Sequence, residues 1–349
     1  MPYPNELAPL TVIPGALRFN TDSMELEYYR GGPVGFGTTT QTGEWVNLTT
    51  DSPDIQTGGA RGVFAGGNTT PGNTNTIDYV TISTTGNAID FGDLYSVGNA
   101  SSSCASSTRG ITGGGYPTTN VIQYITISST GNSQDFGDLT QTRYYLTSLS
   151  NATRGLFGGG ITNPAGTSFN IIDYITIAST GNAVSFGSLG SVKYSVASCS
   201  NTTRGIFAGG VGSTNVIEFI TLSTLGNTTS FGNLSVARST LAGCSNAIRG
   251  LFGGGSVPGS NSNVIDYITI SAAGNAIDFG DLTVARSSIS ACSSSNRGLW
   301  GGGYVPGASN IIDYITIMSI GNAIDFGDLS SGAARDSLGA LSNGHGGLG

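Results

Sequence analysis

One pattern is written six times along this chain, and only one segment of the pattern changes length. Each copy opens on an Arg-Gly pair, and successive pairs lie 48, 45, 50, 45 and 48 residues apart. Repeats of this period are typical of propellers and solenoids. The pairs begin at Arg61, Arg109, Arg154, Arg204, Arg249 and Arg297.

The rest of each copy keeps its length. When the six copies are aligned, each shared position forms a column. One column, of acidic or amide residues, lies 13 residues before a Phe-Gly pair, and each of the first five Phe-Gly pairs lies 18 residues before the next Arg-Gly pair. All variation falls between the glycines after Arg-Gly and that column, where the gaps are 11, 8, 13, 8, 11 and 10 residues. A constant frame with one variable loop indicates a scaffold that presents the loop. The column holds Asp78, Gln123, Asp173, Glu218, Asp266 and Asp313.

Composition excludes several classes of partner. The 349 residues are only 10% charged, the net charge is −8, and Lys193 is the single lysine. A nucleic-acid surface needs clustered Lys and Arg, so we expect no nucleic-acid partner. The start of the chain lacks the basic and apolar regions of a secretory signal. No apolar run reaches the ~18 residues of a membrane span, so we expect no membrane insertion.

The four cysteines share one column, five residues before an Arg-Gly arginine. Equivalent positions of a propeller lie around a ring, whereas disulfide-bonded Cα atoms must approach within about 7 Å. We therefore expect reduced, buried thiols that act as small hydrophobic side chains. The one histidine, His345, completes no metal-ligand pattern. The cysteines are Cys104, Cys199, Cys244 and Cys292, and Leu149 holds the column in the third copy.

Strand signals recur four times per copy. In the fifth copy, Arg249–Gly255 predicts a strand that ends in glycines, and Asn263–Ser271 predicts a strand with apolar residues on both faces. The pair Gly274-Asn275 predicts a tight hairpin turn before a strand at Ala276–Leu282. Ser287–Ser293 is a short strand of small residues. Apolar residues on both faces indicate a sheet sandwiched between neighbours, as a propeller blade is.

This order of elements resembles kelch-type propellers, in which a strand, a glycine doublet, a variable loop and a strand precede an aromatic residue. In the fifth copy the resemblance rests on Gly254, Gly255, Tyr267, Phe279 and Arg286, with Phe where kelch repeats usually have Trp. It implies an all-β fold, a six-bladed kelch-like β-propeller of four-stranded antiparallel blades.

The C-terminal residues supply a missing strand. Arg335 and Leu341 continue two columns of the repeat, whereas Gln56, near the start, is a poor match to the second of these columns. We therefore expect the C-terminal strand to complete the blade begun at Arg61, so that residues 51–349 form one closed propeller. Closure removes an open sheet edge, which is an aggregation hazard.

Eleven of the thirteen basic residues fall in two repeat columns, and most acidic residues repeat with them. A catalytic site breaks the symmetry of a propeller, and these residues keep it. We therefore expect the arginines to bridge strands or blades through carboxylates and carbonyls. We expect no catalytic residue, no metal, no cofactor and no enzyme; a glycan-degrading enzyme with paired carboxylates is the less favoured alternative. The columns are the Arg-Gly arginines and Arg143, Lys193, Arg238, Arg286 and Arg335.

Residues 1–50 lie outside the repeat. Alternating apolar residues predict a hairpin with its turn at Asn20–Ser23, and Glu44–Leu48 predicts a third strand. The segment resembles a small module of tailed-bacteriophage fibre and appendage proteins. The resemblance implies a virion protein that this module joins to other virion proteins, with the propeller as the exposed head. It rests on Gly15, Arg18, Phe19, Asn20, Thr21, Asp22, Leu26, Glu27, Tyr29 and Trp45.

The expected function is therefore non-covalent binding by a phage virion protein, with a host surface glycan or protein receptor as the partner. The variable loops and the crossovers between blades should share one face. Tyr116, Phe169 and Tyr304 are the aromatic residues on those loops, where they either stack on sugars or merely cover the blade ends. A purely architectural role as a capsid or tail decoration, packed on other virion subunits, remains the alternative. The oligomeric state stays open, with a homo-oligomer as one option.

Overall fold

The computed structural model of the chain describes residues 17–20, 25–31, 43–47, 59–69, 72–330 and 334–348. The chain divides into two compact units, Met1–Ser52 and Pro53–Gly349. In the first unit, β1 (Leu17–Asn20), β2 (Glu25–Gly31) and β3 (Gly43–Asn47) form an antiparallel sheet in that order, as predicted. Gln56, and Gly15, Thr21 and Asp22 of the N-terminal motif, lie outside the described residues.

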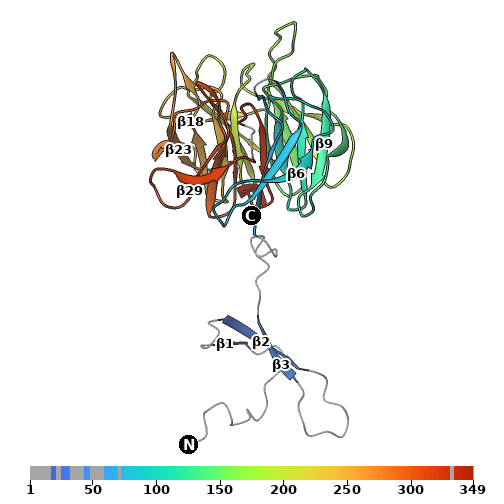
Figure 1. Cartoon of the computed structure of the whole chain (residues 1–349), viewed down its shortest axis with the longest axis vertical. Coiled ribbons are helices and arrows are strands. Elements are labelled where there is room, and N and C mark those ends of the chain that lie inside the picture. Colours follow the sequence, from blue (N-terminus) through green and yellow to red (C-terminus); the bar gives the residue numbers. More distant parts are fainter. Residues whose placement is uncertain are drawn as a thin grey trace, which may run out of the picture. The chain divides into compact units, whose positions relative to one another are not determined.

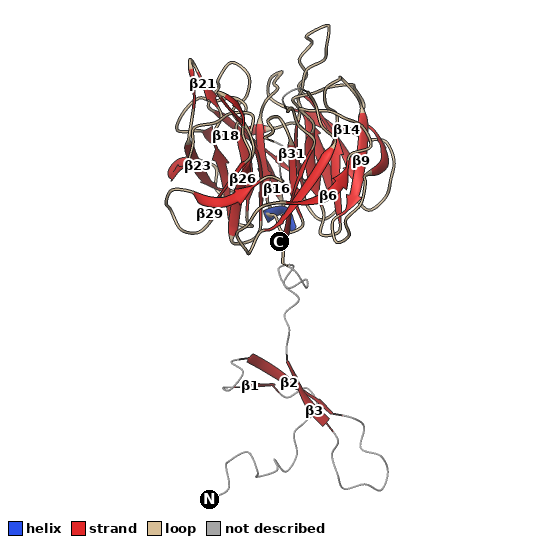
Figure 2. Cartoon of the chain, viewed as in Figure 1, coloured by secondary structure: helices blue, strands red, loops and turns tan. Residues whose placement is uncertain are grey.

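The second unit is a six-bladed β-propeller of four-stranded antiparallel sheets (Figures 1 and 2). We number the blades in chain order from the Arg-Gly pair at Arg61. The first three are blade 1, with β31 (Gly339–Ser342), β4 (Arg61–Ala65), β5 (Thr76–Thr81) and β6 (Ile89–Asp93); blade 2, with β7 (Ser102–Ala105), β8 (Arg109–Gly113), β9 (Val121–Thr126) and β10 (Gln134–Asp138); and blade 3, with β11 (Thr147–Ser150), β12 (Arg154–Gly158), β13 (Ile171–Thr176) and β14 (Val184–Ser188).

The remaining three blades repeat this order from the axis outward. They are blade 4, with β15 (Ala197–Ser200), β16 (Arg204–Ala208), β17 (Val216–Thr221) and β18 (Thr229–Asn233); blade 5, with β19 (Ala242–Ser245), β20 (Arg249–Gly253), β23 (Val264–Thr269) and β24 (Ile277–Asp281); and blade 6, with β25 (Ser290–Ser293), β26 (Arg297–Gly301), β29 (Ile311–Thr316) and β30 (Ile324–Asp328).

The hydrophobic core lies between the blades. One cluster packs Leu156 and Ile172 of blade 3 against Phe207 and Ile220 of blade 4, and all four side chains are buried. Similar clusters recur around the ring. Since each sheet buries both faces, apolar residues on both sides of the third strand were the right signal for a blade.

The cysteine column explains the glycine of each Arg-Gly pair. All four cysteines are free and buried, as expected. A Cβ on Gly250 would lie 2.6 Å from the sulfur of Cys199 in the preceding blade, so only glycine leaves room for that side chain. Leu149 approaches Gly205 in the same way. Burial raises the pKa of Cys104 to about 12, which leaves the thiol protonated at neutral pH.

The Gly-Asn pairs dock one blade on the next instead of closing a tight hairpin, so that expectation was wrong. Gly181 of blade 3 donates its N–H to the carbonyl of Phe136 in blade 2 at 2.8 Å. Asn182 accepts the N–H of Asp138 at 3.0 Å. A Cβ on Gly137 would lie 2.5 Å from the Gly181 carbonyl oxygen, so the Phe-Gly glycine allows this close approach.

The C-terminal strand closes the ring in the expected register. β31 pairs with β4, and Leu341 lies opposite Val63. The last junction repeats the docking contact of the others, because Gly86 of blade 1 donates to the carbonyl of Phe326 in blade 6 at 2.8 Å. All six blades therefore have their innermost strand.

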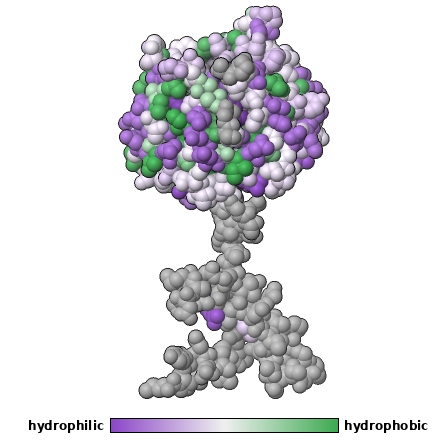
Figure 3. All heavy atoms as spheres, viewed as in Figure 1, coloured by the Kyte–Doolittle hydropathy of each residue, from purple (hydrophilic) through white to green (hydrophobic). Residues whose placement is uncertain are grey.

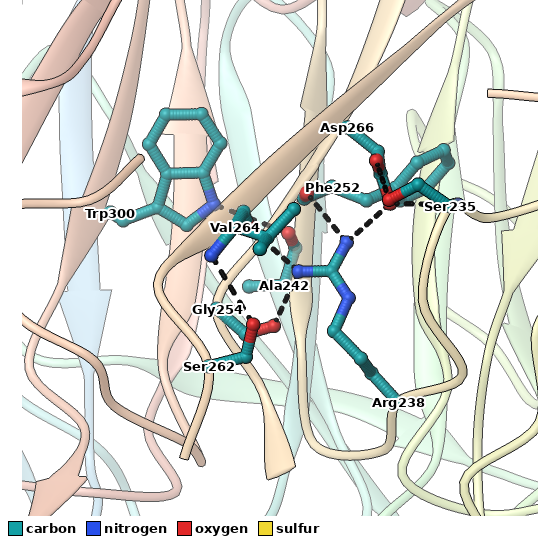
Figure 4. A network of polar contacts seen from close by, with 9 residues as sticks. All are labelled: Ser235, Arg238, Ala242, Phe252, Gly254, Ser262, Val264, Asp266 and Trp300. Atoms are coloured by element: carbon teal, nitrogen blue, oxygen red, sulfur yellow. Dashed lines mark hydrogen bonds and ion pairs between the residues drawn. The ribbon is translucent and has the colours of Figure 1, made fainter. Parts of the chain in front are cut away.

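The two basic columns are both structural, but they use different partners. Arg238 is fully buried between blades 4 and 5, where it pairs with Asp266 at 2.6 Å and donates to the carbonyls of Gly254 and Val264 (Figure 4). Arg249, from an Arg-Gly pair, instead donates to the carbonyl of Ile317 in the next blade. The Arg-Gly guanidinium groups also lie over aromatic rings of their own blades, at 4.6–5.2 Å.

Candidate functional site on the variable-loop face

The variable loops lie together on one face of the propeller, as expected. Each loop joins the second strand to the third and pairs with the crossover that enters its own blade, as Ile161 does with Tyr144. Two loops form hairpins of their own, β21 (Ser256–Val257) with β22 (Ser260–Asn261) and β27 (Tyr304–Val305) with β28 (Gly307–Ala308). β21 marks this face at the top of Figure 2. We call it the loop face.

A belt of backbone hydrogen bonds surrounds the propeller axis on the loop face. Six residues that precede the innermost strands have φ between 51° and 56°, which is uncommon for residues other than glycine. Each donates its N–H to the carbonyl of the equivalent residue in the preceding blade, at 2.7–3.1 Å, and the six bonds close a circle. The conformation is therefore set by the ring rather than by local sequence. The residues are Ala100, Tyr145, Ser195, Thr240, Ser288 and Ser337.

An axial channel of about 170 Å³ runs between the innermost strands. Serine side chains line blades 2 to 4, at Ser103, Ser148 and Ser198, whereas the equivalent residues of blades 5 and 6 are Gly243 and Ala291. At this position the hydroxyl is therefore present in blades 2 to 4 and absent from blades 5 and 6, although serines of every blade also line the channel.

The C-terminal turn closes the channel at the opposite face. It ends in the short 3₁₀-helix η3 (Gly346–Leu348). The Nε2 of His345 lies 2.9 Å from the carbonyl oxygen of Ala105, and its Nδ1 accepts the N–H of Gly347 at 3.1 Å. The two partners assign the neutral Nε2–H tautomer. Burial lowers the pKa of His345.

Four tyrosines form a contiguous cluster on the loop face beside the channel mouth. Tyr144 lies between Tyr116 and Tyr145, with ring centroids at 5.5 and 5.1 Å, and Tyr145 stacks on Tyr194 at 6.4 Å. Tyr116 is 40% exposed and the other three are half-buried. We call these residues the tyrosine cluster. Elsewhere around the ring the positions of Tyr144 and Tyr194 hold Asn99, Ser239, Ser287 and Asp336.

Amide and carboxylate groups border the tyrosine cluster. Asn99 donates to the side chain of Asn73 at 2.7 Å, and Asn73 donates to the carbonyl of Tyr116 at 3.2 Å. Asp336 accepts from Asn68 at 3.3 Å. Exposed aromatic rings beside amides and a carboxylate form the kind of surface that binds sugars, because sugar rings have apolar faces and hydroxyl edges.

Tyr145 connects the cluster to the channel. Burial raises the pKa of Tyr145, and a hydrogen bond with the side chain of Ser337 opposes that shift. Tyr145 belongs to blade 3 and Ser337 to blade 1, so the tyrosine reaches past the small Ala100 of blade 2. The channel mouth is therefore asymmetric.

The structure brings one of the three predicted site residues into this arrangement. Tyr116 belongs to the tyrosine cluster. Phe169 is half-buried on the long loop of blade 3, and Tyr304 is 49% exposed on the β27–β28 hairpin of blade 6. The ring contacts of the described residues join neither of them to Tyr116.

Sequence reasoning missed Tyr144, Tyr145 and Tyr194. They lie on the crossovers between blades, in the 18-residue spacing that is constant among the copies, whereas the predicted site residues came from the loops that vary in length. Aligning the six copies would have exposed them, since Tyr144 and Tyr194 are aromatic where the other copies are polar.

Nothing in the described part of the chain assembles a metal site, because no three His, Cys, Asp or Glu side chains group there. The ion pairs of the described residues lie at the blade junctions. Within the same residues, no helix is long and apolar enough to cross a membrane.

Comparison with known protein families finds no family model that matches this chain, and comparison with curated proteins finds no match either.

Proposed function

We propose that this protein is a structural component of a tailed-phage virion whose propeller binds a host surface glycan through its loop face. The observation that carries the proposal is the tyrosine cluster with its bordering amides, the feature of the loop face that departs most from the repeat. Binding without catalysis fits a propeller whose ion pairs, among the described residues, lie at the blade junctions.

The path of the chain supports the loop face as the face that binds. The first propeller strand, β4, starts at Arg61 on the face opposite the loop face, and η3 ends the chain on that same opposite face. The strand through which the chain enters the propeller therefore begins away from the loop face. The virion assignment rests on the resemblance of residues 15–45 to phage appendage modules.

A second candidate, the architectural role, has an observation of its own. Exposed apolar side chains lie on turns of the opposite face in blades 4 to 6, at Leu225, Ile248, Met318 and Ile320. Such residues suit contact with another protein. On the side of the propeller drawn in Figure 3, apolar residues are scattered among hydrophilic ones.

The test compares two tyrosines at equivalent positions of different blades. Tyr116→Ala removes the most exposed member of the tyrosine cluster, and Tyr304→Ala removes a similarly exposed ring outside it. We expect labelled full-length protein to bind a panel of bacterial surface polysaccharides, and Tyr116→Ala to weaken binding about tenfold, or ~1.4 kcal/mol. Tyr304→Ala should bind as the unchanged protein does. Equal losses from both variants, or no binding to any polysaccharide, would reject the tyrosine cluster as a glycan site.

A further inference from the structure

The axial channel has one closed end. Its lining extends from residues of the backbone belt on the loop face, such as the half-buried Ser288, to Ser150 and His345 at the opposite face. The C-terminal turn packs tightly there, because a Cβ on Gly347 would overlap the carbonyl oxygen of Ser150. A ligand can therefore enter the channel from the loop face but cannot pass through it.

The channel has the volume of about one sugar ring. It measures about 170 Å³. A cavity of about 150 Å³ engineered in another protein accepts benzene, which is a six-membered ring. A pyranose is also built on a six-membered ring, so the channel has space for one sugar residue and not for a chain of them.

The side chains that face the channel at mid-depth are small. Ser148, Ser198, Ala291 and Ala340 are half-buried residues of the innermost strands. The outer strands of each blade cover these strands from outside, so the exposed part of each side chain faces the channel. Hydroxyl and methyl groups at the same depth suit a sugar ring, which has hydroxyl edges and apolar faces.

The hydroxyls at mid-depth keep hydrogen-bonding capacity for a ligand. Those of Ser148 and Ser102 lie 2.7 Å apart, and since only one of the two donates to the other, one O–H is left over. Ser198 donates to the carbonyl of Ser148 at 2.6 Å and accepts from Thr147 at 2.7 Å, which leaves one lone pair. The serines nearer the floor instead donate to carbonyls of the preceding blade; they are Ser150, Ser200, Ser245, Ser293 and Ser342.

The channel contains no charged side chain that could pair with a ligand. None of the described residues that line it is Asp, Glu, Lys or Arg. His345 at the floor is neutral, because both of its ring nitrogens are hydrogen-bonded to the backbone and burial lowers its pKa. A charged ligand group would lose its water without gaining a counter-ion, so the channel favours an uncharged ligand.

Tyr145 makes the channel continuous with the tyrosine cluster. It lines the channel, and its ring centroid lies 5.1 Å from that of Tyr144 and 6.4 Å from that of Tyr194. A sugar residue in the channel would therefore lie next to a second residue that rests on the cluster.

We propose that the axial channel binds the uncharged terminal sugar residue of a glycan chain or branch, while the next residue rests on the tyrosine cluster; this inference rests on the glycan-binding function proposed above. Ser148 and Ser198 would hydrogen-bond with hydroxyls of the terminal residue, and Ala291 and Ala340 would contact one of its faces. A residue inside a chain has neighbours on both sides, so the closed floor excludes it from this depth.

The test uses NMR titration of the full-length protein with single sugars. The probes are the methyl glycosides of D-glucose, D-galactose and D-mannose, each beside its uronic acid. We expect amide shifts at Ser148, Ser198 and Ala291 with at least one neutral sugar, and at least tenfold weaker binding of the matching uronic acid. Uronic acids that bind in the channel as well as the neutral sugars do would overturn the proposal.

A variant at the channel mouth tests the proposal from the protein side. Ser288 is the belt residue of blade 6, across the ring from Tyr145 of blade 3, and both have φ of 51°, so this backbone already accepts a tyrosine. Ser288→Tyr should leave the melting temperature unchanged, narrow the mouth and weaken sugar binding at least tenfold. Ser179→Tyr, on an exposed turn of the opposite face, is the matched control and should bind normally. Ala291→Val narrows the channel deeper and replaces Ser288→Tyr if that variant does not fold.

The outcomes separate this inference from the function on which it rests. Shifts confined to the tyrosine cluster, unchanged binding by the folded channel variants, or binding of a polysaccharide but of no single sugar would overturn the channel and leave glycan binding standing. If neither the single sugars nor the polysaccharides bind, glycan binding itself is rejected and the channel proposal falls with it.

Discussion

Each buried arginine of this propeller forms an ion pair with a carboxylate in the next blade. The arginines of the Arg-Gly pairs do not, so we expect the two basic columns to differ in how much they stabilise the fold. Arg238→Ala would leave the carboxylate of Asp266 buried without its ion pair. We expect a loss of about 3–5 kcal/mol in the free energy of unfolding, measured by chemical denaturation.

The matched control is Arg249→Ala in the Arg-Gly column. Arg249 donates to the carbonyl of Ile317 at 3.0 Å, lies 4.6 Å from the ring centroid of Tyr267, and has no carboxylate partner in the described structure. Its loss should be about 1–2 kcal/mol. Similar losses in the two variants would mean that the carboxylate partner does not decide the cost.

His345 makes the stability of the channel floor depend on pH. Burial lowers its pKa from 6.5, so folding favours the neutral ring. The stabilisation is complete above about pH 6.5 and is lost as the pH falls from there through the lower pKa of the folded state, by about 1.4 kcal/mol per unit of difference. Protonation also removes the acceptor for the N–H of Gly347.

The measurement is urea denaturation of the unchanged protein and of His345→Gln at pH 7.5 and 5.5. Carboxylates titrate equally in both proteins, so the difference between them isolates His345. The unchanged protein should lose more stability than the variant on acidification. Equal losses of stability in the two proteins would show that His345 does not cause the pH dependence.

At the residue scale, the sequence predicted roles that repeat and missed those that do not. The cysteine column and both basic columns were visible because most copies share them. The tyrosine cluster was not, because its members come from three blades and only the folded crossovers bring them together.

The elements could be predicted closely because strand patterns are local. The segment Asn263–Ser271 became β23 (Val264–Thr269), and Arg249–Gly255 became β20 with the two following glycines in the turn. The docking of Gly-Asn pairs onto the preceding blade could not be predicted, since a turn sequence does not specify what packs against it.

Shortening the longest variable loop, in blade 3, tests whether the loop contributes to host binding or to folding. Residues 163–167 are exposed, and the loop rises above the others in Figure 1. Replacing residues 161–170 by the shorter 211–215 of blade 4 should leave the melting temperature within a few degrees, because blade 4 already folds with that length. Host adsorption by phage carrying the shortened loop should fall while assembly stays normal. Defective assembly with normal adsorption would favour the architectural role.

At the scale of the whole molecule, closure depends on the last strand. Deleting residues 333–349 removes β31 and leaves β4 without its inner partner. It also removes Arg335, whose partner Asp78 is fully buried. We expect a sharp drop in melting temperature, or aggregation through the open edge, seen by light scattering. A truncated protein that stays monomeric and melts like the full chain would show that the ring closes without β31.

Blade 1 combines β31 with β4, β5 and β6, so its sheet is completed later during synthesis than those of the other blades. Blades 2 to 6 each contain four consecutive strands, so each is complete once its own segment leaves the ribosome. β4, β5 and β6 emerge first among the propeller strands, yet they must wait for Gly339–Ser342 before their sheet is whole. The nascent propeller therefore carries an unpaired strand edge until β31 is made, and that edge is then sealed by its own chain or by a neighbour.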